Sequence, residues 1–299
     1  MNDENMRLEP LSDTVFNYMF SDSGMKISMQ EIINSVLNDA GDAEISEVQE
    51  ITTQYEVKKR GFGAHGGRVD VRARTADGTL FDIEVQLKAQ PAMNARSWFY
   101  GSGIMSEEFR EGTPYEQVPK VRVINLLDFV LRKSHPDYLQ PIKMLYAKQP
   151  EEATDVFRIY NIEMPKYRAE SPTLESVKDD PLKCWLYMLD KGYESDHEME
   201  VLGQMTEGMQ AFAKRYKVSL TDPELKRMYD LEMSAKRDQA SAVYNARNEG
   251  MVEGMEKGRT EERRLIVQSM VKNGVPTEII YKSVAAPRAE IDAIIAQMN

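Results

Sequence analysis

The segment from Gly67 to Gln86, GRVDVRARTADGTLFDIEVQ, limits the possible folds of this chain more than any other. Polar and apolar residues alternate in its first and last parts, which predicts two strands that each bury one face. The turn residues Asp77-Gly78 lie between these parts, so we expect an antiparallel hairpin. Each polar face has an acid in its middle, Asp70 in RVDVRAR and Glu84 in FDIEVQ.

The length of the turn decides how the two acids are placed. A two-residue turn at 77–78 would put the Asp70 carboxylate on the apolar face of the hairpin. A three-residue loop over 76–78, with glycine at the position that needs a positive φ, pairs polar residues with polar residues throughout. This register sets Asp70 directly opposite Glu84, with Cβ atoms about 5 Å apart.

Two carboxylates at this distance repel each other when both are ionised, and the pKa of one of them rises. A divalent cation removes the conflict, and Mg²⁺, with Mn²⁺ as a substitute, prefers carboxylate oxygens and water. Alternatively, Arg68 and Arg72 neutralise the acids as a surface network and no ion is bound. The pattern alone is compatible with both interpretations.

Basic residues gather just before and within the hairpin. The net charge of −11 argues against attraction of the whole surface to nucleic acid. The range 58–74 nevertheless holds six Lys or Arg and one acid, enough for a local phosphate-binding patch. A solvated strand face is the simpler interpretation. The DNA-contact candidates in this range are Lys58, Lys59, Arg60, Arg68 and Arg72.

Hydrophobic periodicity predicts an α/β or α+β core that ends near residue 165. Helical spacing is found at the N-terminus and again after the hairpin, and β-branched or apolar runs indicate further strands. The expected order is two helices, three strands, one helix and two more strands. The helices are expected at 11–22, 28–39 and 92–112, and the strands outside the hairpin at 47–58, 120–131 and 153–167.

From Leu174 onward the pattern is helical, so we expect an α-helical region over 174–299. Its Glu-Gly repeats at 249–258 place Gly250, Gly254 and Gly258 on one helix stripe. That stripe is either a close helix contact between subunits or a frayed, solvated helix. We expect a homo-oligomer, with a dimer favoured, through these helices. Two short helices around Ala286-Pro287 are expected to form an interaction tail.

Cysteine content and hydropathy indicate the setting of the protein. The single cysteine, Cys184, excludes intrachain disulfides, and its apolar neighbours favour a buried thiol. No apolar run is long enough to cross a bilayer, and the polar N-terminus does not resemble a signal peptide. We therefore expect a cytoplasmic protein with no membrane partner.

The hairpin segment DVRARTADGTLFDIEVQ resembles the core of the PD-(D/E)XK nuclease superfamily. More narrowly, the chain resembles the Rpn-type recombination-promoting nucleases, a group that includes transposases. DTVFNYMF at 13–20 and the range 95–129 match further family segments in order, and the likeness covers about 8–165. It implies a restriction-endonuclease-like core, a mixed sheet flanked by helices, over 1–170. The helical C-terminal region then spans 171–299.

The resemblance implies a Mg²⁺-dependent DNA endonuclease that hydrolyses phosphodiester bonds, associated with recombination, transposition or defence against mobile elements. Asp70 and Glu84 would hold the metal, and the backbone carbonyl of Val85 would add a ligand. Gln86 would orient the attacking water by hydrogen bonding, because an amide cannot act as a general base. Asp13 is a fourth catalytic candidate by family position, with a helix-cap role as the alternative.

Arg96 and Tyr100 are spaced i, i+4 on the helix after the hairpin, so both can face the site and contact DNA. Packing against the sheet is the alternative for Tyr100. Two positions depart from the family pattern. Asn17 stands where the family has Lys, and Gln86 stands where the wider superfamily has a catalytic Lys, although Gln is usual in this subfamily. Asn17 and the overall acidity favour the competing hypothesis, an inactive DNA-binding or oligomeric assembly protein on the same scaffold.

Overall fold

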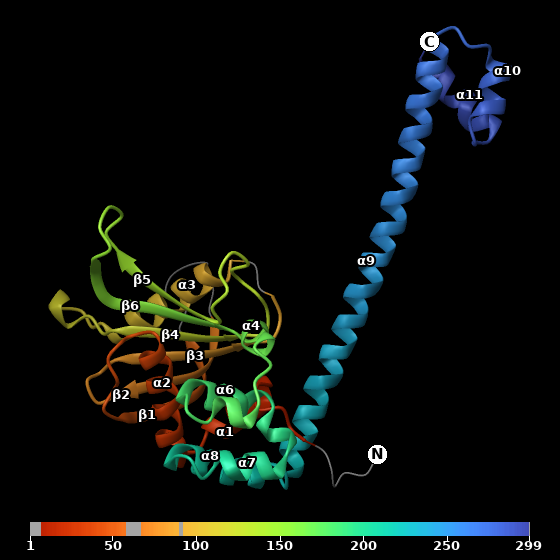
Figure 1. Cartoon of the computed structure of the whole chain (residues 1–299). Coiled ribbons are helices and arrows are strands. Elements are labelled where there is room, and N and C mark those ends of the chain that lie inside the picture. The colour runs from red at the N-terminus through yellow and green to blue at the C-terminus, as the bar shows by residue number, and fades with distance from the viewer. Residues whose placement is uncertain (1–6, 58–66, 90–91, 299) are drawn as a thin grey trace. The chain divides into compact units, whose positions relative to one another are not determined.

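The computed structural model describes residues 7–57, 67–89 and 92–298. The chain divides into two compact units, Met1–Asp230 and Leu231–Asn299. The first unit contains a six-stranded sheet in the order β1-β2-β3-β4-β6-β5 (Figure 1). The strands are β1 (Val48–Val57), β2 (Gly67–Thr75), β3 (Leu80–Gln86), β4 (Val121–Leu127), β5 (Leu139–Leu145) and β6 (Glu152–Glu163).

The sheet is mixed. The strands β1, β2 and β3 are antiparallel, β3, β4 and β6 are parallel, and β5 returns antiparallel to β6. This arrangement confirms the expected restriction-endonuclease-like core, a mixed sheet flanked by helices. The carboxyl ends of β3 and β4 therefore lie side by side, at the open end of the β2–β3 hairpin.

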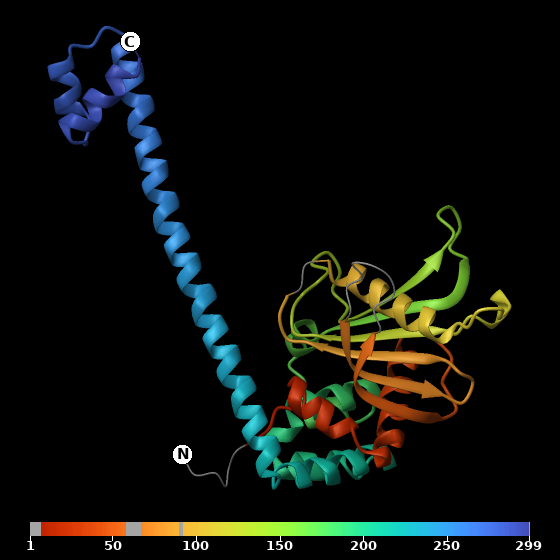
Figure 2. The ribbon, with the colours of Figure 1, turned by 180° about the vertical axis from the view of Figure 1, so that it is seen from behind.

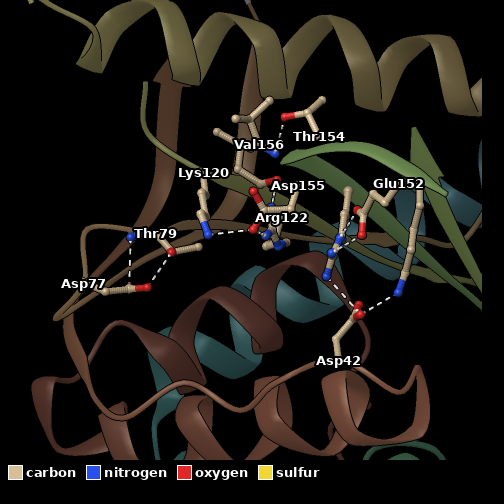
Figure 3. Close-up of polar contacts among 12 residues, drawn as sticks. Asp42, Asp77, Thr79, Lys120, Arg122, Glu152, Thr154, Asp155 and Val156 are labelled. Carbon is tan, nitrogen blue, oxygen red and sulfur yellow. Dashed lines mark hydrogen bonds and ion pairs between the residues drawn. The ribbon is translucent and has the colours of Figure 1, made fainter. Parts of the chain in front are cut away.

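The hairpin has the predicted register and loop. Val71 pairs with Ile83, and Arg72 pairs with Asp82. The Thr75 N–H donates to the Thr79 carbonyl at 3.0 Å, which closes a three-residue loop over 76–78. Gly78 has a φ of 81°, a value that glycine adopts without strain. The Asp77 carboxylate accepts hydrogen bonds from Thr79 inside the loop (Figure 3).

The edge strand β5 was not expected from the sequence. Its residues LQPIKML contain Pro141, which removes one ladder donor and weakens the strand pattern. Proline is tolerated there because β5 lies at the edge of the sheet, where one side of the backbone needs no partner. The strand predicted for 120–131 is shorter than expected and ends at Leu127.

Helices cover both faces of the sheet. Helix α3 (Met93–Glu108) packs its Ile104 against a cluster that includes Leu80 and Phe157. A Cβ atom added to Gly101 of α3 would lie 2.4 Å from the Phe157 ring, so only glycine permits this close approach. Helices α1 (Asp13–Phe20) and α2 (Lys26–Asp39) lie on the opposite face (Figures 1 and 2).

The helices after the sheet belong to the first unit. Helix α2 contacts both α6 and α8, so the structural division at 230 falls later than the change in sequence character near 170. Cys184 of α6 is buried, as expected. The helices are α4 (Met164–Ala169), α5 (Leu174–Val177), α6 (Pro181–Asp190), α7 (Asp196–Leu202) and α8 (Glu207–Ser219), and short 3₁₀ turns occur at Ser23–Met25, Tyr115–Gln117 and Gly192–Glu194.

The second unit has its own small core. Helix α9 (Pro223–Lys272) is continuous across the division of the chain. Its last turns pack with α10 (Thr277–Ser283) and α11 (Arg288–Ala296), the two short helices expected around Ala286-Pro287. The core residues are Val267, Ile280, Val284, Ile291 and Ile294. Among the described residues, no helix is both long and apolar enough to cross a membrane.

Asp42, which follows α2, links the end of that helix to the sheet (Figure 3). Its carboxylate pairs with Lys143 of β5 at 2.5 Å and with Arg158 of β6 at 2.9 Å. It also accepts a hydrogen bond from the Tyr160 hydroxyl at 2.6 Å. Burial raises the pKa of Asp42, but these hydrogen bonds and charges outweigh it and lower the pKa below its ordinary value.

We predict that Asp42→Asn destabilises the protein by about 2–4 kcal/mol at pH 7, because it removes the counter-charge of the partly buried Lys143 and one of the two acids that pair with Arg158. The folded-state pKa is lower than the unfolded one, so the stabilisation exists above about pH 4 and disappears as the pH falls through the folded value. Urea unfolding from pH 3 to pH 7 measures the effect. A difference between variant and wild type that does not shrink in acid would contradict it. The surface variant Glu175→Gln, in an exposed pair with Lys178, is the control.

Candidate active site

The pairing of β2 with β3 stops beside Asp70, and a side chain replaces the backbone ladder. The paired residues run from Arg74–Leu80 to Val71–Ile83. At the next position, the Asp70 carboxylate accepts the Val85 N–H at 2.9 Å. The N–H and carbonyl of a strand residue point to the same side, so the Val85 carbonyl is also directed toward β2. This end of the hairpin therefore forms a fork with polar groups on both strands.

Glu84 is buried at the same fork, with 6% of its surface exposed. One carboxylate oxygen, Oε2, accepts a hydrogen bond from Gln86 Nε2 at 2.9 Å. The other, Oε1, has no hydrogen-bond partner among the described residues. Burial raises the pKa of Glu84 well above its ordinary value, and the charges of Asp82 and Asp70 raise it further. The backbone N–H of Asp70 and the charge of Arg96 act in the opposite direction.

Asp82 is a third acid of the site, which the sequence reasoning did not select. It is 1% exposed, and its Oδ1 has no hydrogen-bond partner within the described ranges. The pKa of Asp82 is raised to about 8, mainly by burial and also by the charge of Asp70, against the opposing charge of Arg72. The signal in the sequence was its spacing: Asp82 is two residues before Glu84, on the same strand face.

Helix α3 supplies the groups that cover these acids. Arg96, Tyr100, Ser97 and Met93 line a cavity of about 10 Å³ that Asp82 and Glu84 also line, together with Val123 and Asn125 of β4. The Arg96 guanidinium lies 5.4 Å from the centre of the Tyr100 ring. Tyr100 also packs against the hydrophobic cluster under α3. The structure thus brings Arg96 and Tyr100 to the cavity that Glu84 lines, and it shows the packing role considered for Tyr100.

The structure describes only some of the basic residues that were predicted to contact DNA. Arg72 is 7% exposed and donates to Glu108 of α3 at 2.6 Å, so its guanidinium holds the end of that helix on the sheet. This geometry favours a structural role over contact with DNA. Arg68 lies on β2, but its side chain is outside the described part of the structure. The three remaining candidates, Lys58, Lys59 and Arg60, lie entirely outside the described residues.

Asp13 is the first residue of α1 and is exposed. Ser12 is the N-cap, because its side chain accepts the Val15 N–H, so capping does not explain Asp13. Helix α1 contacts β1 and β2. Asn17 is 8% exposed and donates to the Asp13 carbonyl at 2.7 Å, so its amide turns back onto its own helix.

Backbone strain is found beside the fork. Gln54 of β1 has a φ of 52°, an uncommon value for a non-glycine residue. Pairs on either side of it, Thr53–Val71 and Tyr55–Val69, place Gln54 opposite Asp70. A residue in this conformation costs about 1–3 kcal/mol, and such costs concentrate at functional sites. The strain at Gln54 therefore supports the region around Asp70 as the candidate functional site.

The donor set fits a hard divalent cation. Across the described residues, no three His, Cys, Asp or Glu side chains converge as a ready metal-binding group. Mg²⁺ does not require one, because it binds through one or two carboxylates and completes its shell with water and phosphate oxygens. Asp70 and Glu84 supply two carboxylates at one fork, and the unmatched Glu84 Oε1 is an available acceptor. The acids fit the metal that the fold implies.

A mixed sheet with acids at the end of its hairpin, and a helix carrying Arg96 above them, defines a nuclease-like protein of the PD-(D/E)XK class. The family model described as PD-(D/E)XK nuclease family transposase matches residues 10–246, so the chain belongs to this family. Comparisons with curated proteins and with solved structures find no match. Family membership indicates a role related to nuclease activity or transposition.

We predict that Asp82→Asn stabilises the metal-free protein at pH 8 by about 2 kcal/mol, because it removes a carboxylate whose ionised form is unfavourable in the buried site. The folded-state pKa is above the unfolded one, so the wild-type side chain destabilises the fold progressively as the pH rises from about 4 to about 8. Denaturant unfolding in chelator measures this. A variant less stable than the wild type at pH 8 would refute it. The exposed acid Asp230, changed to Asn, is the control.

Proposed function

We propose that this protein is a Mg²⁺-dependent DNA endonuclease, with Mn²⁺ as a possible substitute, that hydrolyses phosphodiester bonds during recombination, transposition or defence against mobile elements. The observation that carries the proposal is the junction of Asp70 with Glu84 at the hairpin fork. The Val85 N–H donates to the Asp70 carboxylate at 2.9 Å, and the backbone N–H of Asp70 acts on Glu84 by lowering the pKa of its carboxylate. Family membership supports the same activity.

Asp70, Glu84 and the Val85 carbonyl would hold the metal, which when bound would lower the pKa of a water and offset phosphate charge. Gln86 already uses its Nε2 to hold Glu84, so its amide oxygen is the group left to accept a hydrogen bond from the attacking water. Asp13 remains a further candidate from family position.

Arg96 is the proposed phosphate contact, because its charge acts on Glu84 and it lines the cavity above the acids. A guanidinium can bind two phosphate oxygens through parallel N–H donors. Tyr100, beside Arg96, would limit how far the guanidinium can move. Lys58, Lys59, Arg60 and Arg68, whose side chains lie outside the described part of the structure, are proposed to contact DNA phosphates.

The competing proposal is an inactive DNA-binding or assembly protein on the same scaffold. The observation that favours it is Asn17, which is buried and turned toward the Asp13 carbonyl where the family has a cation. Such a protein would bind DNA with an affinity that falls as salt rises, yet would not cut it.

Incubation of supercoiled plasmid with Mg²⁺ or Mn²⁺ tests the endonuclease. We expect nicking by the wild type and a loss of about 1000-fold or more in Asp70→Ala and Glu84→Ala, because transition-state stabilisation of several kcal/mol depends on the metal. Asp230→Ala, which removes an exposed acid of α9, should keep wild-type activity.

Equal nicking by the wild type and both site variants would show that a contaminant or another site does the cutting. Salt-sensitive DNA binding without nicking in either metal would favour the inactive alternative. In that case, Asn17→Lys places a cation at this position. Nicking by Asn17→Lys would show that the wild type lacks only the cation, and no nicking would show that the function itself is lost.

We also propose a homodimer through α9. Three glycines, Gly250, Gly254 and Gly258, have open space where a Cβ would lie. Large apolar side chains on the same helix are exposed, among them Val243, Met251 and Met255. The expected result of sedimentation velocity is a dimer for the wild type and a monomer for Gly254→Glu. A monomeric wild type at micromolar concentration would refute this proposal.

A further inference from the structure

A row of buried polar side chains continues from Glu84 across the parallel part of the sheet. Glu84 of β3 is in register with Asn125 of β4, and Asn125 is in register with Asn161 of β6. Asn125 is 0% exposed and Asn161 is 2% exposed. Buried amides are unfavourable unless hydrogen bonds compensate them, so this row requires a reason.

The two amides tie helix α3 to the sheet. Asn125 Nδ2 donates to Asn161 Oδ1 at 2.7 Å and to the Ser97 hydroxyl of α3 at 3.0 Å. Asn161 Nδ2 donates to Asn94 Oδ1 of the same helix at 2.9 Å. Both attachment points on α3 lie within its first turns, on either side of Arg96 in sequence.

Within the described residues, the start of α3 has no side-chain cap. Its N-cap residue, Ala92, provides no side-chain hydrogen bond and has a φ of 56°. Four backbone N–H groups at a helix start normally need such partners. The hydrogen bonds to Asn94 and Ser97 therefore take a large part in fixing where the first turns lie, and with them the position of Arg96 above Glu84.

Asn125 also lines the cavity that Arg96 and Glu84 line. Its Oδ1 is buried without a hydrogen-bond partner among the described residues, as is Glu84 Oε1. Both residues line the cavity of about 10 Å³ below Arg96 and Tyr100. That volume is at the lower limit for one water molecule, which could donate to both oxygens. An amide is suited to this place because a carboxylate would add a negative charge beside Glu84.

We propose that Asn125 is a positioning residue that aligns Arg96 of α3 with Glu84 of β3, through its hydrogen bonds to Ser97 and Asn161. The proposal rests on the endonuclease function. It goes beyond the acids and Arg96 themselves by assigning their relative placement to a buried amide that touches neither DNA nor the reacting atoms.

The test compares Asn125→Ala with Asn34→Ala in the full-length, metal-free protein. Asn34 is the matched control because its amide makes two hydrogen bonds to the Ile45 backbone, away from α3. Hydrogen exchange measured by mass spectrometry should be at least about tenfold faster in the first turns of α3 for Asn125→Ala only. Equal exchange in the two variants would overturn the proposal.

A double-mutant comparison separates alignment from general loss of stability. If Asn125 acts through Arg96, Asn125→Ala should slow single-turnover nicking by about 10- to 100-fold. Adding it to Arg96→Ala should then cause little further loss. Additive losses would show that Asn125 does not act through Arg96. If Asn125→Ala does not fold, Ser97→Ala removes the same link and replaces it in both measurements.

The two proposals can fail independently. A wild type that never nicks DNA would remove the endonuclease function, and the exchange measurement would still decide whether Asn125 holds α3. A wild type that nicks, together with α3 exchange that is unchanged in both Asn125→Ala and Ser97→Ala, would leave the endonuclease intact and overturn the positioning role.

Discussion

The burial of Asp82 and Glu84 beside Asp70 is the constraint on which the site depends. Removing carboxylates from water is costly, and their mutual repulsion adds to that cost. Both pKa values are raised for this reason. A fold selected for stability alone would place apolar residues at these positions. The acids are instead retained at the centre of a sheet whose surrounding strands are otherwise well packed.

Other features of the fold accommodate these acids. The backbone ladder between β2 and β3 gives way to the contact between Asp70 and the Val85 N–H. Gln54 is strained at the neighbouring register position. The close approach of α3 at Gly101 encloses the acids, and Arg72 with Glu108 fastens the far end of that helix. The packing of α3 leaves Asp82 and Glu84 buried from water, and weaker screening strengthens the interaction of a carboxylate with a cation.

The hairpin could be predicted from the sequence because its determinants are local. Alternation fixed which residues share a face, and the glycine at position 78 fixed the loop. The same register sets Asp82 opposite Arg72, but the burial of Asp82 under α3 has no signal in the hairpin itself. The decisive contact, from Arg72 to Glu108, joins residues 36 positions apart and has no local signature. The amides of β4 and β6 were missed for a similar reason, since the register of parallel strands depends on the crossovers between them.

The division of the chain into two units shows the same limit of prediction from local sequence. Helical patterns after residue 170 were recognised correctly, but periodicity does not reveal what a helix packs against. Helices α6 and α8 complete the first unit through α2. Only the last turns of α9 build a separate core with α10 and α11. The edge strand β5 was hidden by Pro141, which a central strand would not tolerate.

The central claim is that Asp70 and Glu84 bind one divalent cation together. Titration of Mn²⁺ into the metal-free protein, followed by electron paramagnetic resonance, tests it without requiring DNA or turnover. The account predicts saturable binding to the wild type and the loss of that binding in both Asp70→Asn and Glu84→Gln. Binding that survives in the two variants, or that is absent from the wild type at millimolar Mn²⁺, would contradict it.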